Sequence, residues 1–163
     1  MPKTYEPIAT YTLGSAQTTI TFSSIPQTYT DLVLIYSAKY TSAGSSEMRF
    51  NGDTSNNYSL TYLYGSGTVA GSGRNSNQPA IYVDYTGSTT NFVLNKVDIM
   101  DYANTTTSKT ALIRTGDVST QTAAEVALWR KTPEAITSIS LFYASNFATG
   151  STFKLYGIQA GNA

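Results

Sequence analysis

The chain contains no cysteine and no histidine. Without thiols it cannot form disulfides or use a thiolate nucleophile, and the redox compartment stays open. Without imidazole it lacks the usual group for proton exchange near neutral pH and the preferred nitrogen ligand of zinc and iron. We therefore expect a protein that binds rather than catalyses, with no cofactor and no catalytic or metal-ligating residues.

Charge is also scarce. Charged residues make up 12% of the chain, and ten basic and ten acidic residues give a formal net charge of +0. Because no like charges run together, the attraction to phosphate backbones or anionic lipid is missing, and neither nucleic acid nor a membrane is expected as a partner. No apolar run is long enough to span a bilayer, and residues 1–7 lack the apolar region of a secretory signal. We expect a soluble product made in a cytoplasm.

Residues typical of β-strands are abundant in the chain. Its 163 residues include 13 Tyr, 6 Phe, 26 Thr and 19 Ser. Aromatic and β-branched side chains suit pleated surfaces, and a chain of this length fits one domain with one core. Alternating apolar and polar residues, separated by Gly, Asn, Asp, Ser and Pro, are typical of half-buried antiparallel strands. The expected strands are residues 9–13, 19–22, 31–39, 47–50, 58–64, 80–85, 92–100, 110–114, 125–130, 136–145 and 153–159.

Ten or eleven strands are too many for one open sheet of this size, so we predict an all-β, two-sheet antiparallel sandwich of the jelly-roll type. Residues 9–13 and 19–22 are expected to form a hairpin, and residues 31–39 the middle of the core. A change of apolar parity near Asn95 and Lys96 predicts a bulge. Residues 1–8 contain two prolines, which oppose regular structure, and are expected to form an extended arm before a single domain over residues 9–163.

Two local patterns invite a functional interpretation, and each has a plainer one. The glycine-rich stretch Gly65–Gly73 could cradle phosphate, but no Gly-Lys-Ser/Thr ending or helix follows, so a mobile hairpin loop is favoured. Asn51–Asp53, with Asn56 and Asn57, could supply oxygens to calcium, yet lacks the closing glutamate of an EF-hand, so a turn is favoured.

Paired carboxylates could in principle serve a glycosidase. The candidates are Asp98 with Asp101 and Glu125 with Glu134. The first pair would point to opposite faces of a strand and the second spans a turn, so neither makes a good pair.

Exposed aromatic residues are the better candidates for an interface. Tyr58, Tyr62 and Tyr64 share parity with Leu60 and are expected in the core. Tyr82 and Trp129 are expected to face away from their apolar neighbours, and therefore outward. In the expected arm, Tyr5, Pro7 and Ile8 would contact a partner.

Several stretches resemble a family of small virion proteins of tailed bacteriophages, notably those of cyanophages. They are residues 5–10, 20–26, 30–34, 48–53, 58–60 and 153–158. The resemblance spans nearly the whole chain, in strand and turn patterns rather than in a catalytic signature. It implies a jelly-roll structural protein that decorates the capsid or sits on the tail, and it transfers no functional residue.

The leading hypothesis is a capsid decoration or cement protein that stabilises the shell. It would reside in the virion, assembled in the host cytoplasm, and bind the major capsid protein and its own copies as a dimer or trimer. A nearly uncharged surface fits this role, because many like-charged copies would repel each other on a shell. The alternative is a carbohydrate-binding or receptor-recognition module of a phage tail that grips host glycan. A third hypothesis is a calcium-dependent adhesive domain.

Overall fold

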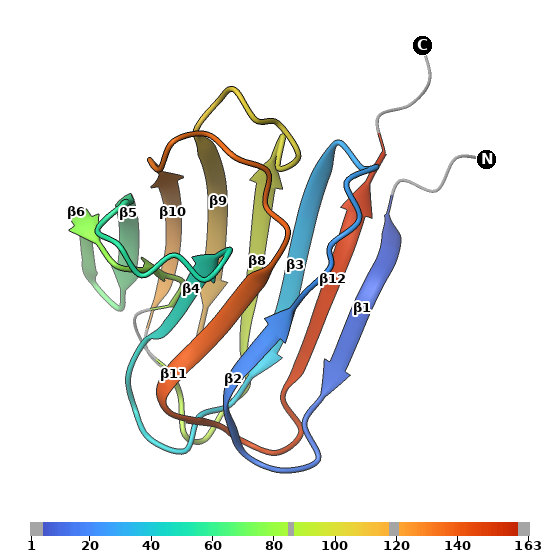
Figure 1. Cartoon of the computed structure of the whole chain (residues 1–163). Coiled ribbons are helices and arrows are strands. Elements are labelled where there is room, and N and C mark those ends of the chain that lie inside the picture. The colour runs from blue at the N-terminus through green and yellow to red at the C-terminus, as the bar shows by residue number, and fades with distance from the viewer. Residues whose placement is uncertain (1–4, 85–86, 118–120, 160–163) are drawn as a thin grey trace.

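The computed structural model describes residues 5–84, 87–117 and 121–159. Two antiparallel sheets pack face to face, which confirms the predicted all-β sandwich, and their arrangement is consistent with a jelly roll (Figure 1). In the described residues no helix is present that is long and apolar enough to cross a membrane. The strands are β1 (Glu6–Thr12), β2 (Gln17–Phe22), β3 (Asp31–Ala38), β4 (Ser46–Phe50), β5 (Tyr58–Ser66), β6 (Val69–Gln78), β7 (Ile81–Tyr82), β8 (Val93–Met100), β9 (Lys109–Gly116), β10 (Thr122–Trp129), β11 (Ile139–Phe147) and β12 (Thr152–Ile158).

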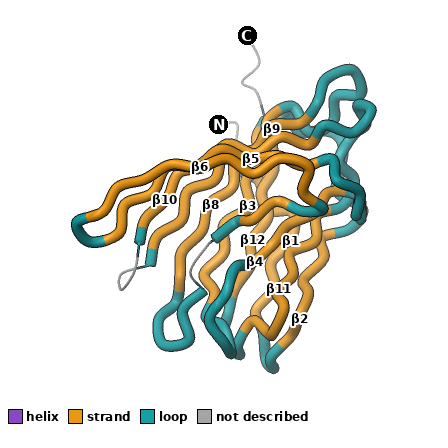
Figure 2. The backbone as a smooth tube through the Cα atoms, turned by 90° about the vertical axis from the view of Figure 1, so that its left-hand side faces the viewer, coloured by secondary structure: helices purple, strands orange, loops and turns teal. Residues whose placement is uncertain are grey.

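The two sheets differ in size. The large sheet has eight strands in the order β1-β12-β3-β8-β9-β10-β5-β6, and the small sheet has four in the order β2-β11-β4-β7. The large sheet extends beyond the small one on the side of β10, β5 and β6 (Figure 2). The face of the large sheet turned toward the small sheet is called the inner face here, and the opposite one the outer face.

The core lies between the sheets and follows the two-residue period of strands. On β3, Leu32, Leu34 and Tyr36 are at most 1% exposed, and they pack with Phe50 and Leu141 of the small sheet in one apolar cluster. Val33 on the other face of β3 is also buried, but Asp31, Ile35 and Ser37 on that face are only half-buried. The prediction that this strand is covered on both sides therefore holds only at Val33.

Two predictions about the N-terminal region are wrong. Residues 9–13 and 19–22 do not form a hairpin, because β1 pairs with β12 in the large sheet while β2 pairs with β11 in the small one. The extended arm is also wrong for Glu6–Ile8, which belong to β1, where Glu6 and Pro7 pair with β12. A proline is tolerated there because β1 is an edge strand with a register shift between Pro7 and Ala9. Residues 1–4 lie outside the described residues.

Two predictions about irregular backbone are also wrong. The glycine-rich stretch is not a loop but an ordered hairpin, in which β6 pairs with β5 around a turn at Gly67. No bulge occurs at Asn95, because β8 pairs without a register shift with both β3 and β9. The parity shift arises instead because Asn95, a polar residue, occupies a fully buried position. Tyr85, at the end of the strand predicted over residues 80–85, lies outside the described residues.

Candidate functional site

Exposed apolar side chains gather on the outer face of the large sheet. We call five of them the outer patch: Leu63 (63% exposed), Leu94 (59%), Met100 (48%), Val126 (46%) and Leu128 (39%). They lie on β5, β8 and β10, at positions that alternate with buried residues on β8 and β10 and with half-buried tyrosines around Leu63 on β5. Each strand thus turns one apolar row into the core and another toward solvent.

The strand register joins most of the outer patch across the sheet. Ala124 of β10 lies opposite Leu63, and Val126 lies opposite Leu112 of β9. In the next row, Leu128 and Met100 both lie opposite Thr110. Ala124, Leu112 and Thr110 thus lie between or beside Leu63, Val126, Leu128 and Met100 on the same face. Leu94 lies apart from these four, opposite Gly116 and beyond the row of Lys96 and Arg114.

An ion cluster lies within this face. Asp98 contacts Lys96 at 2.8 Å and Arg114 at 2.5 Å. Partial burial raises the pKa of Asp98, but the hydrogen bonds and charges of Lys96 and Arg114 outweigh it, and the net pKa is lowered. The cluster therefore keeps the carboxylate ionised and, with two cations to one anion, carries a formal charge of +1.

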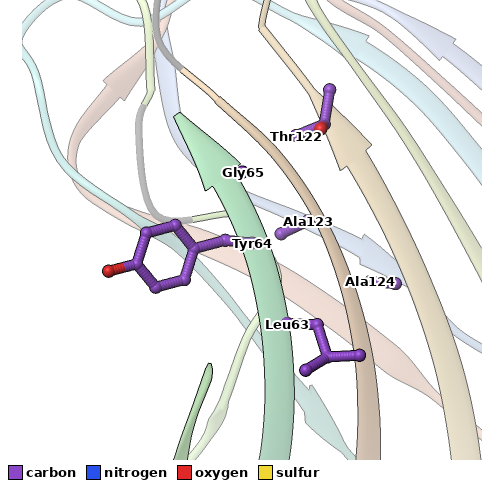
Figure 3. A pocket seen from close by; sticks show the side chains of 6 residues that line it. All are labelled: Leu63, Tyr64, Gly65, Thr122, Ala123 and Ala124. Atoms are coloured by element: carbon purple, nitrogen blue, oxygen red, sulfur yellow. The ribbon is translucent and has the colours of Figure 1, made fainter. Parts of the chain in front are cut away.

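Shallow hollows border the outer patch. One of about 340 Å³ is lined by Leu63, Tyr64, Gly65, Thr122, Ala123 and Ala124 (Figure 3). A second of about 310 Å³ lies beside Leu94, Lys96 and Arg114. A third of about 170 Å³ lies between Arg74, Val126 and Leu128. The outer face thus carries exposed apolar side chains and shallow hollows, which are features of protein docking surfaces. None of these hollows is a deep enclosed cavity of the kind that holds a small ligand.

The inner face carries polar groups where apolar ones are expected. Glu125 is 1% exposed and Asn95 is fully buried, and neither side chain has a hydrogen-bond partner. Burial, and then the charge of Asp84, raise the pKa of Glu125 to about 8. This carboxyl group is therefore mostly protonated at neutral pH.

Asp84 lies in a separate, satisfied network. It accepts hydrogen bonds from the hydroxyl groups of Ser46, at 2.9 Å, and Tyr40. The hydroxyl of Tyr36 lies 2.9 Å from that of Ser46. Burial raises the pKa of Asp84 more than these hydrogen bonds lower it. With Asp84 only 1% exposed, the network joins β3 to β4 inside the sandwich and is closed to a substrate.

The carboxylate pairs considered for a glycosidase are not assembled. Asp98 belongs to the outer ion cluster, and Glu125 is enclosed in the core. Glu134 accepts hydrogen bonds from Lys131 and Asn51, both at 3.0 Å. Within the described ranges, no three Asp or Glu side chains are placed to hold a metal ion.

The Asn51–Gly52 turn is confirmed, with φ angles of 51° and 66°. The carboxylate of Asp53 accepts hydrogen bonds from the side chain of Asn57 and the backbone of Ser55, both at 2.9 Å. These donors occupy the oxygens that a calcium site would need.

The prediction that Trp129 faces outward is wrong. Trp129 is 2% exposed and stacks on Tyr58, with ring centroids 6.3 Å apart, and its indole N–H donates to Asp53 at 2.7 Å. Val126 and Leu128, expected inside, are the exposed residues of β10. The indole, with its larger aromatic surface, lies in the core. Glu125 lies four residues earlier on the same strand, and its side chain therefore also faces the core.

The other predicted interface residues are scattered. Tyr5 is 45% exposed and packs edge-on against Tyr156. Pro7 lies in β1, and Ile8 packs partly buried against the core. Tyr82 is half-buried on β7, opposite Glu47. The structure therefore does not bring the predicted residues together, and sequence reasoning missed the outer patch.

Comparisons with known proteins add little beyond the fold. No family model matches the chain, and no curated protein matches it. Among solved structures, the galectin LEC-6 of Caenorhabditis elegans is 6% identical, with 93% of this chain and 96% of the galectin covered and a TM-score of 0.42. The alginate lyase Aly36B is 10% identical, with 91% and 77% covered and a TM-score of 0.40. At these identities the likeness concerns the arrangement of strands alone.

Proposed function

We propose that this chain is a non-catalytic structural protein of a virion, which binds the outside of a phage capsid as a decoration or cement protein. The docking surface is the outer patch. Its main support is a single observation: five large apolar side chains stay 39% to 63% exposed on one face of the large sheet. Burying such a face against a partner contributes about 25 cal/mol per Å² of apolar surface.

The resemblance of the strand and turn patterns to small virion proteins favours a capsid as the partner. The charge balance of the chain points the same way, because its formal net charge is +0. Neighbouring copies on a shell would not repel each other strongly.

Sedimentation with empty capsids of the parent phage tests this proposal. The double variant L63S/L128S removes two members of the outer patch and should weaken capsid binding at least tenfold. The control is Y11S, because Tyr11 is as exposed as Leu128, at 40% against 39%, but lies on β1. Capsids that do not bind the wild-type chain, or that bind L63S/L128S as tightly as Y11S, would exclude this surface.

A carbohydrate-binding tail module is the second candidate, and one observation favours it. The rings of Tyr62 and Tyr64 lie over Gly73 and Gly71 on the inner face of β6 and remain partly exposed. Tyr64 points away from the side that carries Leu63 (Figure 3). Such a pair of rings can stack against a sugar face. A glycan array tests it: binding by the wild type that Y64A loses would support this candidate, and an array without binding would remove it.

A further inference from the structure

The edges of the two sheets differ in how they are protected. The large sheet ends at β1 and β6, and the small sheet at β2 and β7. An edge strand presents backbone N–H and C=O groups that can pair with a further strand, so proteins usually block edges with proline, charge, bulges or a cover.

Three of these edges are blocked by visible features. β1 contains Pro7 and a register shift. Tyr11 of β1 donates a hydrogen bond to the carbonyl of Thr21 on β2 at 3.3 Å, and its ring lies 5.1 Å from that of Phe22. β1 and β2 therefore cover each other. β7 has only two residues and offers too short a template.

β6 lacks such protection over most of its length. Eight of its ten residues pair with β5 on one side, and in the described part of the chain no strand pairs with the other side. From Val69 to Arg74 the strand has no proline, no register shift and a single charge. The shift in the β5–β6 ladder lies at the other end, between Tyr58 and Leu60. This segment is thus an open edge at the side of the large sheet (Figure 1).

We infer that this edge pairs with β6 of a second copy of the chain, antiparallel about a two-fold axis at Ser72. Gly71 and Gly73 flank Ser72 and would lie opposite each other across the axis, while Ala70 would lie opposite Arg74. An isologous contact uses the same patch on both copies, and no like charges are directly opposed in this one. The two copies of Arg74 would be about 14 Å apart along the strands, which exceeds the Debye length of about 8 Å at physiological salt.

The side chains leave room for this pairing. On the inner face, a Cβ atom at Gly71 or Gly73 would collide with the ring of Tyr64 or Tyr62. The bulky groups therefore belong to β5, one strand back from the edge, and β6 itself carries hydrogen at these positions. On the outer face, Ser72 is small and exposed. Joining the two edges would also continue one outer patch into the other.

The experiment measures self-association in the absence of any capsid, so its result does not depend on the proposed function. Sedimentation velocity over a wide range of concentration should show the wild-type chain as a dimer. S72K places two lysines opposite each other at the axis and should weaken the dimer tenfold or more. The control T10K puts the same charge on an exposed residue of β1, the other edge, and should leave the dimer intact.

Charge reversal makes the test specific to this contact. S72E alone should weaken the dimer as S72K does, while an equimolar mixture of S72K and S72E should recover a heterodimer, because opposite charges then face each other. Unchanged far-ultraviolet circular dichroism shows that the variants fold. A monomeric wild type, or a dimer that S72K weakens no more than T10K does, would overturn the inference.

Discussion

The two faces of the large sheet depart from the usual distribution of side chains in opposite ways, each at a few positions. The inner face, closed by the small sheet, holds Glu125 and Asn95 without hydrogen-bond partners. The outer face leaves Leu63, Leu94 and Val126 exposed to solvent. Buried polar groups without partners lower the free energy of unfolding, and exposed apolar side chains add little to it. The comparison teaches that the inner face determines the stability of the fold, while the outer face is free to serve binding.

The largest expected effect contrasts two adjacent residues of β10. W129A should lower the free energy of unfolding by about 3–5 kcal/mol, because it empties a core position and removes the indole donor to Asp53. L128A, on the outer face, should cost less than about 1 kcal/mol. Urea unfolding followed by circular dichroism measures both. Equal losses would mean that the outer face is also part of the stabilising core.

Glu125 should make stability depend on pH. Its pKa rises from an ordinary 4.5 to about 8 in the folded chain, so between these values only the folded state holds the proton. The free energy of unfolding should therefore fall as pH rises through this window and level off above it. E125Q keeps the neutral form and should be more stable than the wild type by about 4 kcal/mol at pH 8.

At pH 4 the wild type and E125Q should unfold alike, since Glu125 is then protonated in both states. E134Q serves as the contrasting control. Hydrogen bonding from Asn51, followed by the effects of burial and Lys131, leaves the pKa of Glu134 lowered. The ionised Glu134 therefore stabilises the fold at high pH. E134Q should lower the free energy of unfolding there, whereas E125Q should raise it. A pH profile that E125Q does not change would show that Glu125 is solvated.

A smaller gain is expected at Asn95. N95L replaces an unpaired amide with an apolar side chain of similar size between Val93 and Val97, both buried. It should raise the free energy of unfolding by about 1–2 kcal/mol. N95D puts a carboxyl group there instead and should lower it. Urea midpoints order the three proteins, and a loss of stability in N95L would indicate that the amide has a partner.

The smallest effect is expected on the outer face. V126T keeps the β-branched shape and exchanges a methyl for a hydroxyl group at a position that is 46% exposed. It should change the free energy of unfolding by less than about 0.5 kcal/mol. If the outer patch binds the capsid, the same change should weaken that binding. A clear loss of stability would contradict the division of roles between the faces.

The sequence was sufficient to predict the sandwich, because most strands are buried on one face and therefore alternate apolar and polar residues. Asp31–Ala38 and the Asn51–Gly52 turn fall where they were predicted. Which strands pair could not be predicted from the sequence. The pairing of β1 with β12, for example, joins opposite ends of the chain, and no pattern of neighbouring residues indicates it.

The candidate site was not predictable from parity alone. In β10, apolar residues occupy both faces, and the sequence T-A-A-E-V-A-L-W suggests that Val126 and Leu128 lie inside. The structure buries Glu125 and Trp129 instead, because the large indole fits against Phe50 and Tyr58. β6 escaped prediction for a different reason: glycine and serine disfavour strands, and only pairing with β5 makes this segment extended.

The position of Trp129 gives the molecule a built-in optical probe. It is the only tryptophan of the chain, and it contacts Tyr58 of the large sheet and Phe50 of the small one. Separation of the layers would expose the indole to water and shift its fluorescence emission to longer wavelengths. Opening of the sandwich can therefore be followed in the isolated, unlabelled protein.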